Sequence, residues 1–158
     1  MSRDDRFNAA AAALGASFDG EIKIGGHYVP LVRHADIIHL SGQIPRVGDD
    51  VVVTGAVGGE VSLDRAREGA GICTLRALAL LKRELGSLDA IVAILRMTVY
   101  VHSAPTFTKH SEVADAASDL LVNILGAAGA HARTSVGVAQ LPKSASVEIE
   151  ITAAVAAR

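Results

Sequence analysis

The chain has 158 residues and a formal net charge of −2, and 50% of its residues are hydrophobic while 20% are charged. This length fits one domain with a sizeable core, and the composition excludes a disordered chain. A broad nucleic-acid surface needs clustered Lys and Arg, so we expect no nucleic-acid partner, although one local basic site is compatible with this charge. The single cysteine, Cys73, excludes an intramolecular disulfide and is expected in the core.

The N-terminal residues carry acids and lead into an alanine run, which differs from the apolar segment of a secretory signal. No apolar run approaches the ~20 residues needed to span a bilayer. We therefore expect a cytoplasmic protein with no membrane partner.

Residues 1–20 are predicted to form a helical extension that precedes a single domain at 21–158. Ser2 is a candidate N-cap, Asp4 and Asp5 follow in the first turn, and Gly15 ends the alanine-rich segment. We expect this short helix to pack on the domain or on a neighbouring subunit.

The next part of the chain alternates in hydrophobicity and is rich in β-branched residues, which is typical of strands. The strands are expected at 28–33, 37–41 and 51–54, with a turn at 34–36.

Two long helices are predicted in the second half of the chain. Ser62 caps the first, which runs to about Leu85 and ends at Gly86. A largely buried strand follows at 91–101, and a second amphipathic helix is expected at about 106–125.

The C-terminal segment is predicted to contain two strands, within 132–142 and 146–151, joined by a turn at 141–144. Pairing them as a hairpin would place Arg133 near Glu148 or Glu150. A guanidinium with a nearby carboxylate can hold an anionic substrate and act on it.

The element order β-β-β-α-β-α-β-β predicts an α+β sandwich in which two long helices cover one face of a mixed six-stranded sheet. The other face of such a sheet must be covered, which makes oligomerisation physically reasonable.

Three sequence blocks carry a resemblance to a known family. They are IIHLSGQIP at residues 37–45, preceded by Tyr28, MTVYV at 97–101, and ARTSVGVAQLP followed by SVEIEI at 132–151. Together they resemble the RidA/YjgF family of imine and enamine deaminases, also labelled endoribonuclease L-PSP, in a divergent branch. The resemblance implies a chorismate-mutase-like fold and a homotrimer with clefts between subunits, with no cofactor.

The resemblance assigns Arg133 and Glu148 as the catalytic residues. Arginine stays charged and its planar fork fits a substrate carboxylate, whereas a glutamate can orient and deprotonate a water. The alternative for Arg133 is a structural salt bridge to Glu148 or Glu150. The alternative for Glu148 is an ordinary polar strand position, which is what we expect of Glu150.

Four further residues are expected to bind substrate. Tyr28 matches the family's active-site tyrosine, with a plain surface or core tyrosine as the alternative. Gly42 would permit close backbone approach, with a β-bulge as the alternative. Ser135 replaces the family's common cysteine, whose backbone helps bind substrate, and Ser111 stands where the family often carries a polar asparagine.

The six histidines show no tight ligand spacing, so we expect no metal site. Among them, His131 is the one expected to line the cleft.

The expected reaction is hydrolytic deamination of small 2-imino or 2-aminoenoate acids to 2-oxo acids and ammonia. A non-catalytic, acid-binding or chaperone-like trimer is the alternative. Ribonuclease activity ranks last, because the chain offers no clear His or Lys pair and no basic, aromatic surface.

Overall fold

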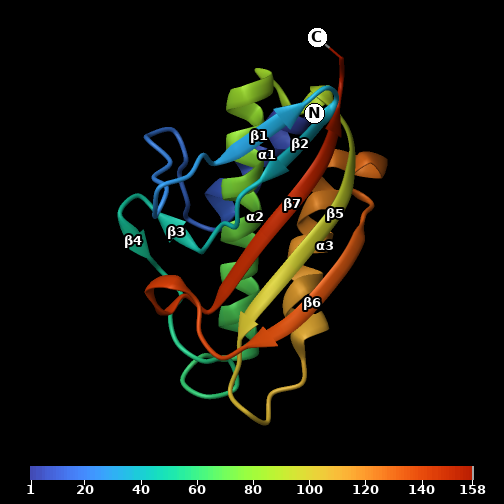
Figure 1. Cartoon of the computed structure of the whole chain (residues 1–158). Helices are drawn as coiled ribbons and strands as arrows, with labels where there is room; N and C mark the ends of the chain where they lie inside the picture. The colour runs from blue at the N-terminus through green and yellow to red at the C-terminus, as the bar shows by residue number, and fades with distance from the viewer. Residues whose placement is uncertain (158) are drawn as a thin grey trace.

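A five-stranded mixed sheet forms one layer of the computed structural model, which describes residues 1–157 (Figure 1). Its strand order is β1-β2-β7-β5-β6. The strands are β1 (Leu31–His34), β2 (Ile37–Leu40), β5 (Ile91–His102), β6 (Ala132–Val138) and β7 (Val147–Val155). Two two-residue strands, β3 (Arg46–Val47) and β4 (Asp50–Val51), form a separate antiparallel pair.

The α+β architecture is confirmed, but the prediction of a six-stranded sheet is wrong. The segment expected as a third strand at 51–54 contributes only Val51 to β4. Both backbone edges of β7 are already occupied, by β2 and by β5, so this segment has no free edge in the centre of the sheet. It turns instead under α2, where Val53 is buried.

The predicted hairpin between the two C-terminal strands is also wrong. Both strands exist, but β5 lies between them: Met97 pairs with Arg133 on one side and with Ile151 on the other. β6 follows a helix that returns from the end of β5, and such a crossover produces a parallel neighbour. A short turn, which includes the 3-10 helix η3 (Pro142–Ser144), precedes β7. This turn passes the end of β5, so that β7 pairs with the edge of β5 opposite to β6.

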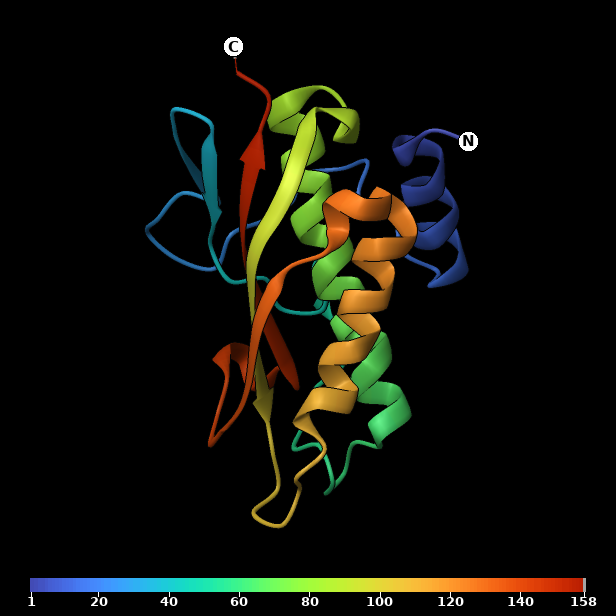
Figure 2. The same ribbon diagram turned by 90° about the vertical axis from the view of Figure 1, so that its right-hand side faces the viewer.

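Two helices, α2 (Leu63–Leu85) and α3 (His110–Leu125), cover one face of the sheet, and α1 (Arg3–Ala13) packs outside them (Figure 2). Two further 3-10 helices, η1 (Leu88–Ala90) and η2 (Gly126–Gly129), adjoin the ends of α2 and α3. None of the helices within residues 1–157 combines the length and hydropathy that crossing a bilayer requires.

Local capping signals fix most helix ends. Ser2 forms a capping box with Asp5, Ser62 accepts a hydrogen bond from the Arg65 N–H, and Gly86 ends α2 with φ +84°. α3 starts four residues later than the prediction. Phe107 instead forms a turn with Ala104 and packs edge-on against the ring of His110, so a separate local turn precedes the helix.

The core consists almost entirely of Ala, Val, Leu and Ile side chains between the sheet and the helices. Phe7 and Ala11 of α1 join this core, so the N-terminal helix is docked on the helical layer. Cys73 is fully buried, and desolvation raises the pKa of its thiol well above the usual value, which makes it unreactive.

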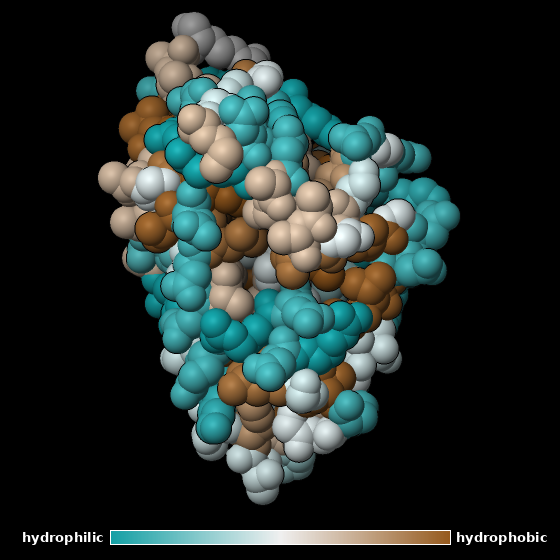
Figure 3. All heavy atoms as spheres, turned by 180° about the vertical axis from the view of Figure 1, so that it is seen from behind, coloured by the Kyte–Doolittle hydropathy of each residue, from teal (hydrophilic) through white to brown (hydrophobic). Residues whose placement is uncertain are grey.

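The two outer faces of the molecule differ in character. Seen from the helical side, hydrophobic areas are small and interrupted by hydrophilic ones (Figure 3). None of α1 to α3 lies on the other side of the sheet (Figure 2). That face exposes four large apolar side chains of the strands: Val32, Val92, Leu95 and Val136.

Candidate functional site

The six predicted site residues separate into two groups. One group lines a cavity beside the ends of β2 and β7: Tyr28, Gly42 and Glu148. The other lies at the edge of the sheet, on β6 and the start of α3: Ser111, Arg133 and Ser135.

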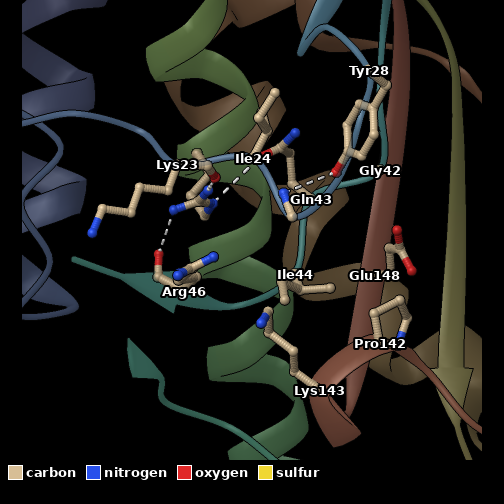
Figure 4. Close-up of a pocket in the computed structure, with 12 residues that line it drawn as sticks. Lys23, Ile24, Tyr28, Gly42, Gln43, Ile44, Arg46, Pro142, Lys143 and Glu148 are labelled. Carbon is tan, nitrogen blue, oxygen red and sulfur yellow. Dashed lines mark hydrogen bonds between the residues drawn. The ribbon is translucent and has the colours of Figure 1, made fainter. Parts of the chain in front are cut away.

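The cavity has a volume of about 150 Å³ (Figure 4). The 23–28 loop forms one wall, the segment after β2 a second, and the turn before β7 a third. Its lining residues are Lys23, Ile24, Gly25, Tyr28, Gly42, Gln43, Ile44, Arg46, Arg76, Pro142, Lys143 and Glu148.

A bulge brings Gly42 against the Glu148 side chain. The backbones of Gln43 and Ile149 exchange two hydrogen bonds, so four residue steps from His39 oppose only three steps from Thr152. A Cβ atom placed on Gly42 would lie 2.2 Å from Oε1 of Glu148. The sequence offered two interpretations of Gly42, a close backbone approach and a β-bulge, and the structure shows both.

Glu148 has the properties of a carboxylate available for chemistry. Desolvation by burial, followed by repulsion from Glu150, raises its pKa. Within residues 1–157 its side chain forms no hydrogen bond or ion pair. Glu150, by contrast, is exposed and accepts a hydrogen bond from the Tyr100 hydroxyl at 3.0 Å.

Tyr28 is half exposed at the mouth of the cavity, and its hydroxyl accepts a long hydrogen bond of 3.4 Å from the Gly25 N–H. In Figure 4 its ring and the Glu148 carboxylate lie near Gly42, on the same side of the cavity. A flat ligand could rest on the ring face while its polar end meets the carboxylate.

The cations of this cavity were not identified from the sequence. Arg76 donates hydrogen bonds to Gln43 Oε1 at 3.3 Å and to the backbone oxygens of Arg46 at 2.9 Å and Lys23 at 3.0 Å. A charged residue within the most apolar part of α2 is the signal that could have revealed it, because an unpaired buried charge is costly.

Arg133 lies in a second polar cluster, between β6 and α3. Its Nη1 donates to Asp115 Oδ1 at 2.8 Å and to Ser118 Oγ at 2.9 Å, and its Nη2 donates to the Ser111 backbone oxygen at 3.5 Å. A salt bridge to Glu148 or Glu150 was the alternative considered for Arg133, and the ion pair that this residue forms is with Asp115. The i, i+4, i+7 spacing of Ser111, Asp115 and Ser118 could have identified this stripe of α3.

His131 extends the same cluster. Its Nδ1 lies 2.6 Å from the Gly129 carbonyl and must donate a proton to it, so in the neutral ring Nε2 accepts from Ser118 Oγ at 2.9 Å. A hydrogen-bond chain thus runs from Arg133 through Ser118 to His131. This chain restricts the orientation of the guanidinium.

Arg133 and Glu148 of one chain project from opposite faces of the sheet. Arg133 pairs with the fully buried Met97 and shares its helix-side face, whereas Glu148 pairs with Tyr100 on the other face. The two side chains therefore cannot hold one small substrate within a single chain.

No cluster of three or more His, Cys, Asp or Glu side chains within residues 1–157 has the arrangement of a metal site.

Comparisons with known proteins identify the family of the chain. The profile of the endoribonuclease L-PSP family matches residues 19–155, so the chain belongs to this family, which is also called the YjgF/RidA family. The family includes imine deaminases as well as proteins named as endoribonucleases.

Particular relatives are similar along nearly the whole chain. Protein TCP17 of Trypanosoma cruzi is 34% identical over 146 residues, covering 92% of this chain and 91% of its own length. A solved structure of a protein of unknown function from Agrobacterium tumefaciens is 32% identical with a TM-score of 0.86, covering 97% of this chain and 94% of that one. A protein from Shewanella oneidensis MR-1, provisionally named as an endoribonuclease, shares the fold with a TM-score of 0.88 at 24% identity, covering 98% of this chain and all of that one (100%).

Proposed function

We propose that the protein hydrolyses small 2-imino or 2-aminoenoate acids to 2-oxo acids and ammonia. The observation that carries this proposal is the state of Glu148: its carboxylate has a raised pKa and no partner within residues 1–157, and it lies beside a cavity and the backbone of Gly42. A carboxylate in this state is suited to general-base catalysis, since burial brings its pKa closer to the working pH.

In the proposed reaction Glu148 orients a water molecule and removes its proton as the oxygen attacks the C=N carbon. The carboxyl group then transfers this proton to the nitrogen, which gives a carbinolamine. Glu148 next takes the hydroxyl proton of the carbinolamine and passes it to the amino group as the C–N bond breaks, so that ammonia leaves and the 2-oxo acid remains. Tyr28 packs against the substrate, and the backbone beside Gly42 approaches it. No cofactor is needed, because the imine carbon is already electrophilic.

Arg133 is proposed to hold the substrate carboxylate, but in a site completed by a second copy of the chain. The opposite projection of Arg133 and Glu148 requires this arrangement if both contact one substrate. The apolar side chains on the helix-free face of the sheet also favour association. We propose a homotrimer, in which Arg133, Ser111 and Ser135 of one copy face Tyr28, Gly42 and Glu148 of the next.

A trapping assay tests the reaction. An amino-acid oxidase generates 2-imino acids, semicarbazide traps them, and active protein suppresses the trapped product. We expect suppression by wild type and its loss in Glu148→Gln. Glu150→Gln is the matched control, because it removes the neighbouring carboxylate outside the cavity, and it should stay active. Equal activity of wild type and Glu148→Gln would contradict the proposal.

The ion pair between Arg133 and Asp115 favours a second candidate, a non-catalytic acid-binding trimer, because this arginine already has an anionic partner. Binding of 2-oxo acids by wild type without suppression of the trapped product would select it.

A further inference from the structure

The cavity concentrates positive charge in a chain whose formal net charge is −2. Four cations line it, namely Lys23, Arg46, Arg76 and Lys143, against the single carboxylate of Glu148. Lys23 forms an ion pair with Asp49, while the other three cations form no ion pair within the described residues. The excess charge is therefore a local property of this cavity.

Arg76 is the most deeply placed of these cations. The residue is only 4% exposed, yet its three hydrogen bonds go to neutral acceptors, two backbone carbonyls and one amide oxygen. A guanidinium has five N–H groups, so two of them have no acceptor in the described part of the chain. Burial lowers the pKa of Arg76, which reflects an uncompensated cost of the charge.

Arg46 adds a second unsatisfied group. Its Nε is buried and has no hydrogen-bond partner within residues 1–157. Buried donors without partners are rare in folded proteins, and binding of an ion is one of the explanations for such a group. Two neighbouring arginines with free donors can hold a carboxylate or a phosphate with charge-assisted hydrogen bonds.

Two of these cations, Lys23 and Arg46, lie apart from Glu148 in the cavity. Figure 4 shows Lys23 and Arg46 on the side opposite to Glu148 and Gly42, with Ile44 between them. No ion pair connects Glu148 to any of the four cations. A ligand whose reacting carbon lies at Glu148 can therefore extend a tail toward the arginines.

We propose that Arg76 and Arg46 form a subsite for a second anionic group, so that the substrate is a small 2-imino acid with a distal carboxylate or phosphate. This inference rests on the proposed function for the imino group, but the anion subsite exists independently of the reaction. Lys143, in the turn before β7, also lines the cavity and adds a positive charge that attracts the distal anionic group.

The test compares three 2-oxo acids, the stable counterparts of the imines, by calorimetry with the full chain. 2-Oxopentanoate has a neutral tail, 2-oxoglutarate has a distal carboxylate on the same number of carbons, and 3-phosphonooxypyruvate has a distal phosphate. At least one anionic tail should bind about tenfold or more tightly than 2-oxopentanoate, as one charge-assisted hydrogen bond provides. Whichever anion binds more tightly identifies the distal group.

Substitution then locates the subsite. Arg76→Met should remove the preference for the anionic tail. Arg83→Met is the matched control, because Arg83 lies two turns further along α2 and also donates to backbone carbonyls of the N-terminal segment, at Phe18 and Gly20, without lining the cavity. If Arg76→Met does not fold, Arg46→Met and Lys143→Met replace it, and each should reduce the preference. Equal binding of all three acids, or a preference that survives these substitutions, overturns the inference.

Glutarate separates this inference from the proposed function, since it has two carboxylates but no group to deaminate. Glutarate binding that Arg76→Met abolishes, together with no imine hydrolysis, retains the subsite and rejects the reaction. Hydrolysis of 2-iminopentanoate without any binding of glutarate or 2-oxoglutarate retains the reaction and rejects the subsite.

Discussion

At the residue scale, Glu148 combines two properties that a catalytic carboxylate needs. Burial and the charge of Glu150 favour its protonated form, and no partner inside the described chain neutralises it. The desolvation that raises the pKa of Glu148 also makes its ionised form costly for the folded state. The proposed catalytic role of Glu148 and the stability of the folded chain therefore place opposite demands on this position.

Glu148→Gln should reveal this opposition in the pH dependence of stability. The folded-state pKa of Glu148 is raised above 4.5, so wild type loses stability relative to the variant as pH rises from about 4.5 through the raised pKa. Thermal unfolding from pH 4 to pH 8 measures this. The Tm of the variant minus that of wild type should increase with pH and then level off. A difference that is constant across this range would show that Glu148 ionises as freely as in the unfolded chain.

Arg133→Lys tests whether the paired hydrogen bonds of the guanidinium are needed to hold the substrate carboxylate. Lysine keeps the charge but cannot donate a planar pair of hydrogen bonds to a carboxylate while also reaching Asp115 and Ser118. We expect kcat/KM in the trapping assay to fall by about tenfold or more, as the loss of one hydrogen bond to a charged group predicts. Full activity in Arg133→Lys would exclude the two-pronged carboxylate contact.

At the element scale, the junction between the end of β2 and β7 determines the shape of the cavity wall. The extra residue in this junction places Gly42 where a methyl group would meet the Glu148 carboxylate. Position 42 therefore requires glycine for a steric reason. This requirement depends on the pairing of Gln43 with Ile149, which sets the position of the Gly42 backbone.

Gly42→Ala should displace the Glu148 side chain and strongly reduce deamination, since a Cβ would lie 2.2 Å from Oε1. Gly20→Ala is a suitable control, because a Cβ there meets no atom within 4 Å and φ is not positive. The trapping assay compares the two variants, with circular dichroism to verify the fold. Similar activity in both would mean that Glu148 can adopt another rotamer without consequence.

The N-terminal helix provides a second element-scale test. Phe7 of α1 is buried against the helical layer and packs near Phe18, so Phe7→Ala should lower the free energy of unfolding by about 3 kcal/mol. Asn8→Ala, at an exposed neighbouring position, should have little effect. Urea denaturation measures both. Equal, small changes would indicate that α1 contributes nothing to the packed core.

At the scale of the whole molecule, local signals were predictable and long-range pairings were not. Ser62 and Gly86 define α2 correctly, because capping depends on residues within one turn. The order of β6 and β7 depends on which edge of β5 each strand occupies, and no local pattern encodes that choice. The wrong hairpin placed Arg133 beside Glu148, and only the sheet topology separates them.

In the candidate site, too, the residues within local sequence motifs were predictable and those brought in by long-range contacts were not. The sequence blocks identified Tyr28, Gly42 and Glu148, which do share one cavity. The two arginines of the cavity, Arg76 and Arg46, come from α2 and from β3, segments that meet only in the folded chain. Their roles could therefore not be predicted from any single stretch of sequence.

In the proposed homotrimer, one active site needs Arg133 of one copy and Glu148 of another. Arg133→Met and Glu148→Gln should each be inactive alone. When they are unfolded together, mixed and refolded, random assembly leaves about one quarter of the interfaces with both native residues, so activity should return to roughly that fraction of wild type. Refolding each variant separately and then mixing their products without exchange of subunits provides the control. If the co-refolded mixture stays inactive while wild type recovers fully under the same conditions, the shared site is contradicted.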